Sequence, residues 1–115
     1  MKKRGIALGG GGMRGFAHLG VMKALAEKEI EFDAYSGTSA GAIVAALMAA
    51  EKSPDEIMDI MKDFSITDVA KILLPVLGLA SLDNLREKVD RILEGKNFSD
   101  LAYPLFLAVS NLTYQ

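Results

Sequence analysis

Short apolar segments alternate along the chain with longer segments in which apolar residues recur every three or four positions. The short segments end in glycine or follow proline, as strands commonly do. They predict strands over residues 5–8, 34–36 and 105–109. The longer segments have the apolar spacing of helices. They predict helices over residues 16–28, 42–50, 53–64 and 81–94. This order favours an α/β fold, with a parallel-sheet core flanked by helices.

Local signals refine two helices and leave one segment open. Ser53 and Pro54 form a typical helix start, because serine caps the free amides and proline suits the first helical position. Residues 42–50 are apolar nearly all round, which indicates a buried helix. Residues 67–80 are interpreted as a short helix broken by a proline and a glycine. The strongly apolar part of this segment, residues 69–80, is either ordinary core or a cap that touches lipid.

The length of 115 residues predicts a single domain over residues 1–115. A sheet of three strands is thin for so much helix, so the domain looks truncated after the third strand. We therefore expect the natural protein to continue beyond Gln115. If the chain ends there, the third strand is an unprotected sheet edge, which favours homo-oligomers.

Composition narrows the function classes. The net charge of −2 weighs against a nucleic-acid partner, and the absence of cysteine excludes disulfides and thiolate metal sites. No cofactor or metal is expected. The longest apolar runs, residues 40–50 and 72–80, are well short of the roughly 20 residues that span a bilayer. We expect a cytoplasmic protein that contacts a membrane surface at most transiently.

The segment Gly37-Thr38-Ser39-Ala40-Gly41 stands between a predicted strand and the buried helix. A Gly-x-Ser-x-Gly turn at such a place projects its serine hydroxyl above the sheet on a strained backbone. Gly37 and Gly41 leave room where a β-carbon would collide with neighbouring chain. Ser39 is thus a candidate nucleophile, at a helix end that favours developing negative charge. The alternative is a plain loop in which Ser39 only caps the helix.

A glycine-rich loop, Gly9-Gly10-Gly11-Gly12-Met13-Arg14-Gly15, follows the first predicted strand. Consecutive glycines let backbone amides point into one space, which suits a phosphate or an oxyanion. The loop also matches the dinucleotide-binding pattern of glycines. That function needs an acidic residue after the second strand, whereas Asp33 precedes it. A glycine turn without a ligand is the remaining alternative.

Taken together, these motifs resemble the patatin-like phospholipase family. The resemblance rests on the glycine loop, on Phe16-Ala17-His18-Leu19-Gly20-Val21-Met22-Lys23-Ala24-Leu25, and on the segment from Gly37 to Ala42. It covers the first fifty residues closely and the others loosely. It implies a lipid acyl hydrolase with a Ser-Asp dyad, in which Ser39 is the nucleophile. The oxyanion hole would then comprise Gly10, Gly11, Gly12, Met13 and Arg14, with backbone amides of this loop facing the oxyanion.

The chain departs from the family pattern in one respect. The family's catalytic aspartate lies in an Asp-Gly motif, and no Asp-Gly dipeptide occurs here. We therefore expect the second dyad residue to be absent from this chain. His18 is the only histidine, but no carboxylate is obviously placed to orient it as a base. We interpret it as a packed or surface residue.

Three hypotheses follow from the sequence. The first is a patatin-like serine acyl hydrolase whose isolated chain has little or no activity. The second is a phosphate- or dinucleotide-binding module that uses the loop at residues 9–15. The third is a non-catalytic assembly unit derived from the hydrolase fold.

Overall fold

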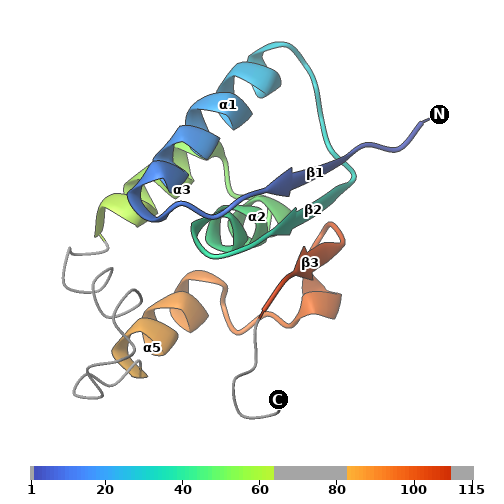
Figure 1. The fold of residues 1–115 in the computed structure, drawn as a ribbon. Helices are drawn as coiled ribbons and strands as arrows, with labels where there is room; N and C mark the ends of the chain where they lie inside the picture. The colour runs from blue at the N-terminus through green and yellow to red at the C-terminus, as the bar shows by residue number, and fades with distance from the viewer. Residues whose placement is uncertain (1, 64–82, 110–115) are drawn as a thin grey trace.

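The computed structural model describes residues 2–63 and 83–109. The segment predicted as an interrupted helix, residues 67–80, lies outside the described residues, as does the start of the helix predicted from residue 81. The described chain folds into a three-stranded parallel sheet flanked by helices (Figure 1). The predicted α/β class is therefore confirmed.

The sheet follows the order of the chain, with β1 (Gly5–Leu8), β2 (Ala34–Gly37) and β3 (Leu105–Leu107) side by side. All neighbours are parallel, and Leu8 pairs with Gly37, which pairs with Leu107. The carboxyl ends of β1 and β2 therefore meet at one edge. The loops that follow them start from adjacent points. The third strand is shorter than the predicted 105–109.

The helices match the predicted segments with shifted ends. In the described chain they are α1 (Phe16–Glu27), α2 (Ala40–Ala49), α3 (Pro54–Asp63) and α5 (Asp83–Ile92). Two short 3-10 helices, η1 (Gly12–Gly15) and η3 (Phe98–Asp100), were not anticipated. The expected cap of α3 is present, because the Glu56 amide donates to Ser53 Oγ at 3.2 Å.

Helix α2 is the centre of the packing. It contacts all three strands, while α1 packs against α3 and against α2 (Figure 1). Val44, Ala45 and Ala49 are fully buried, so the prediction of a buried helix is confirmed. The predicted start at residue 42 was two residues late, because Ser39 already acts as the N-cap and its carbonyl accepts the Ala42 amide at 2.9 Å.

The remaining core completes this arrangement. Leu8 and Tyr35 on the sheet meet Leu19 and Met22 from α1, together with Ile57 from α3. Within residues 2–63 and 83–109, no helix combines the length and apolar character needed to cross a membrane.

Candidate active site

Ser39 occupies the corner between β2 and α2. Its φ of 52° and ψ of −128° lie in a region that residues with a β-carbon rarely adopt. A residue held in such a backbone conformation costs about 1–3 kcal/mol, and the surrounding structure must maintain it. Ser39 is exposed and its hydroxyl makes no capping hydrogen bond to α2. The corner therefore directs an unused hydroxyl outward, which a capping role alone does not require.

The two flanking glycines permit this corner. A β-carbon on Gly37 would meet the backbone of Gly41 and would stand 2.7 Å from the Ala42 nitrogen. A β-carbon on Gly41 would meet the Leu8 carbonyl oxygen. Each clash involves backbone atoms, which cannot rotate away as a flexible side chain can. The absence of side chains therefore lets α2 begin directly against the ends of β1 and β2.

The glycine loop follows β1 at the same edge of the sheet. Gly11 has a φ of +152° and Gly12 a φ of +58°, which glycine adopts without the usual steric cost. The Arg14 amide donates to the Gly11 carbonyl at 3.1 Å and closes a tight turn into η1. The loop thus runs as a side-chain-free backbone from Gly9 to Gly12, exposed at Gly9, Gly10 and Gly11 and half-buried at Gly12.

The loop and the serine corner are in direct contact. A β-carbon built on Gly10 would stand 3.2 Å from Ser39 Cβ and 3.5 Å from Thr38 Oγ1. A β-carbon on Gly15 would stand only 2.7 Å from Ala40 Cβ. The structure therefore brings the predicted nucleophile and the predicted oxyanion loop together at one point.

Two features at this point favour an anion. Ser39 stands at the N-terminus of α2, where free amides and the helix dipole favour an anion. Arg14 belongs to the last turn of η1 and is exposed beside the loop. Met13, which is 61% exposed, adds an apolar side chain next to the same loop. Such surroundings suit an anionic group attached to an apolar one.

His18 makes a contact that the sequence did not predict. Its Nε2 lies 2.7 Å from the Gly9 carbonyl oxygen, although nine positions separate the two residues. The imidazole thus bonds to the glycine loop, where the sequence suggested only packing or exposure. The available signal was its place in the first turn of the helix after the loop, from which a ring can reach back over the loop.

Asp33 and Asp55 have partners away from the serine corner. Asp33 Oδ2 accepts the Arg4 amide at 2.7 Å, at the amino end of β2 and away from the loops. An acid at that end cannot hold a ribose at the carboxyl edge, which weakens the dinucleotide hypothesis. Asp55 pairs with Lys23 at 3.0 Å. In the described ranges, no group of three or more His, Cys, Asp and Glu side chains forms a metal site.

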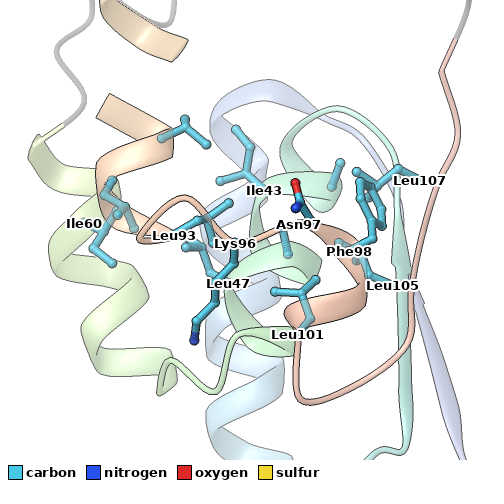
Figure 2. Close-up of a pocket in the computed structure, with 14 residues that line it drawn as sticks. Ile43, Leu47, Ile60, Leu93, Lys96, Asn97, Phe98, Leu101, Leu105 and Leu107 are labelled. Carbon is cyan, nitrogen blue, oxygen red and sulfur yellow. The ribbon is translucent and has the colours of Figure 1, made fainter. Parts of the chain in front are cut away.

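An apolar pocket of about 240 Å³ begins close to the corner. Figure 2 shows its walls, which come from α2, α3, α5 and the segment that leads through η3 into β3. Ala42 and Ile43 belong to the first turn of α2, so the pocket starts within one helical turn of Ser39. It extends past Leu47 to Leu101, and Lys96 and Asn97 supply its polar side chains. The sequence did not predict this pocket, since its walls lie about fifty residues apart.

These features define an α/β protein with a serine on a strand-to-helix corner and a glycine loop beside it. A profile of the patatin-like phospholipase family matches residues 6–114. The chain belongs to this family.

Several relatives match nearly the whole chain. Patatin-like phospholipase domain-containing protein 6 from Mus musculus is 32% identical over 114 residues, which are 94% of this chain and 8% of that protein. Patatin-like phospholipase domain-containing protein 7 from Rattus norvegicus is 33% identical, with the same shares of coverage. Lysophospholipase NTE1 from Mycosarcoma maydis is 34% identical over 96% of this chain and 6% of its own length. The chain thus spans less than a tenth of these three relatives.

Proposed function

We propose that this chain is the nucleophile-bearing part of a serine acyl hydrolase that acts on carboxylic esters of lipids. The observation that carries the proposal is the contact between the two motifs. Ser39 is exposed on a left-handed corner, and Gly10 of the adjacent loop lies against its β-carbon. A nucleophile needs hydrogen-bond donors beside the carbonyl that it attacks, and the backbone of the adjacent glycine loop can supply them.

In the proposed reaction, Ser39 Oγ attacks the acyl carbon and its proton passes to a general base. Amides of Gly11, Gly12 and Met13 hold the oxyanion that forms. The alcohol then leaves with a proton, and water releases the acid from the acyl-serine by the same steps. We place the aspartate of the dyad outside these 115 residues, because no Asp-Gly dipeptide occurs among them.

The apolar pocket supports an acyl chain as the bound group. Its lining begins within one turn of Ser39 and presents almost only carbon to its contents. Its volume of 240 Å³ holds about eight groups the size of a water molecule, at roughly 30 Å³ each. Each methylene buried there contributes about 0.8 kcal/mol. The exposed Met13 beside the loop also suits contact with a lipid surface. The relatives' names, which include phospholipase and lysophospholipase, agree with this substrate class.

Labelling with an alkyl fluorophosphonate tests the proposal, because the reagent bonds to an activated serine and needs no later hydrolysis. We expect slow labelling of the protein at Ser39, located by mass spectrometry of the labelled peptide. Ser39→Ala should abolish the label. Ser99→Ala is the matched control, because Ser99 is also exposed but lies in η3. Labelling that persists in Ser39→Ala would refute the assignment.

Hydrolysis of a nitrophenyl ester tests the place of the base. General-base help is worth about 10²–10⁴ in rate, so we expect this chain alone to hydrolyse the ester slowly or not at all. A rapid burst of nitrophenol from the chain, lost in Ser39→Ala, would show that the base lies within it. A melting shift on adding a dinucleotide, without any labelling, would favour the binding module instead.

A further inference from the structure

The hydrogen bond between His18 and Gly9 ties together the two ends of the glycine loop. His18 is the third residue of α1, and Gly9 directly follows β1. The carbonyl oxygen of Gly9 can only accept a hydrogen bond, so Nε2 of His18 must carry the proton in the 2.7 Å contact. One side chain therefore spans the loop from the helix back to the strand.

The loop needs such a hydrogen bond, because its glycines leave its backbone free to adopt many conformations. Glycine loses more conformational freedom on ordering than any other residue, by about 0.5–1 kcal/mol relative to alanine. Four glycines follow one another from Gly9 to Gly12, and Gly9 and Gly12 have no atom within 4 Å of a built β-carbon. No side-chain packing can hold these positions, so hydrogen bonds to the backbone must do so.

The tie acts on the peptide unit next to Ser39. A trans peptide is planar, and its carbonyl and its following amide point in opposite directions. Fixing the Gly9 carbonyl toward His18 therefore fixes the direction of the Gly10 amide on the other side of the same plane. Gly10 is the residue that lies against Ser39 Cβ. His18 thus acts on the surroundings of Ser39 through one rigid peptide.

We propose that His18 is a positioning residue, whose Nε2–H donates to the Gly9 carbonyl and holds the glycine loop ready for the oxyanion beside Ser39. This inference rests on the proposed acyl-hydrolase function. It assigns the only histidine of the chain to the electrophilic side of the reaction, and not to proton abstraction from Ser39.

The contact can be tested without any activity, since a single histidine gives a single imidazole signal set. In ¹⁵N- and ¹³C-labelled protein, we expect a protonated Nε2 with a scalar coupling across the hydrogen bond to the Gly9 carbonyl carbon. An Nε2 without a proton, or one without this coupling, would overturn the assigned contact.

The role is tested by two replacements that differ in one property. His18→Gln places an amide donor at a similar reach, whereas His18→Phe keeps a ring and lacks a donor. The net value of one hydrogen bond predicts about a tenfold fall in the fluorophosphonate labelling rate for His18→Phe. We expect His18→Gln to stay within about threefold of the natural rate, since it keeps the bond.

The outcomes separate this inference from the proposed function. If the unsubstituted chain is labelled at Ser39 and His18→Phe is labelled at the same rate, only the role of His18 is overturned. If the unsubstituted chain takes no label, both the role of His18 and the proposed function are overturned. If His18→Phe does not fold, His18→Ala serves as the donor-free variant. A melting temperature shared by the Gln and donor-free variants, with only the latter labelling slowly, would support positioning over general stability.

Discussion

At the scale of single residues, the site depends on one residue with a strained backbone and on several glycines that lack side chains. Ser39 keeps a β-carbon at a φ of 52°, while its neighbours Gly37 and Gly41 have none. The strain is stored where the hydroxyl must be presented, and α2 and β2 hold the corner from both sides. A residue without a β-carbon would relieve this strain and would lose the hydroxyl at the same time.

Replacing Ser39 therefore separates stability from chemistry. We expect Ser39→Gly to unfold with a free energy about 1 kcal/mol above that of Ser39→Ala, because glycine accepts the left-handed backbone. Both variants should be unlabelled by fluorophosphonate. Urea denaturation gives the two free energies. The same pair at Ser99, which is absent from the positive-φ residues, should show the reverse order. A less stable Ser39→Gly would contradict the strained corner.

At the scale of elements, helix α2 joins the sheet, the corner and the loop. Its first turn lies on the end of β1, so closely that Gly41 faces the Leu8 carbonyl without space for a methyl group. Gly15 meets Ala40 in a similarly close contact, which ties η1 to the same turn. The geometry of the site is therefore a consequence of helix-on-sheet packing.

Adding one methyl group at two glycines should have opposite effects. Gly41→Ala forces a clash between backbone atoms, and we expect it to lower the free energy of unfolding by about 3 kcal/mol. Gly20 is exposed in α1, and a β-carbon built on it would have no atom within 4 Å, apart from its chain neighbours and the helix's own backbone. Helix propensity predicts that Gly20→Ala raises the free energy of unfolding by about 0.5–1 kcal/mol. Denaturant titration of both variants is the measurement, and equal effects would contradict the close approach of α2 to β1.

At the scale of the whole molecule, the apolar pocket links distant parts of the chain. Helix α2 forms one wall close to Ser39, and α3, α5 and the segment around η3 form the others (Figure 2). Because the pocket runs away from Ser39 along α2, we expect its depth to limit the length of the acyl chain. Its volume thus becomes a specificity determinant of the proposed hydrolase.

Filling the pocket should change chain-length preference without affecting the nucleophile. Ala46 lines the pocket in the middle of α2, and Ala46→Phe should exclude about two methylenes of a bound chain. At about 0.8 kcal/mol each, this lowers the labelling rate of long-chain relative to short-chain fluorophosphonates about tenfold. Val21→Phe, on the exposed side of α1, should leave the ratio unchanged. A ratio unaffected by Ala46→Phe would place the acyl chain elsewhere.

Much of the fold follows from local patterns in the sequence. The strand Gly5–Leu8 is apolar and ends in glycines, and the all-round apolar character of residues 42–50 marks a buried helix. The spacing of apolar residues and the positions of glycine and proline act within a few residues, so they can be recognised without knowing the fold. The glycine loop and the serine corner are also local, because each depends on residues that relax backbone sterics over five to seven positions.

The contacts that make these motifs one site are long-range. Gly10 beside Ser39, Gly41 under Leu8, and the pocket between α2 and α5 join residues that are roughly thirty to fifty positions apart. Even the bond from His18 to Gly9 depends on how α1 leaves the loop. Local patterns carry no information on which surfaces meet, since packing selects these partners only when helices settle on the sheet. The candidate motifs could therefore be predicted from the sequence, while the distances between them arise from the packing of α2 against the strands.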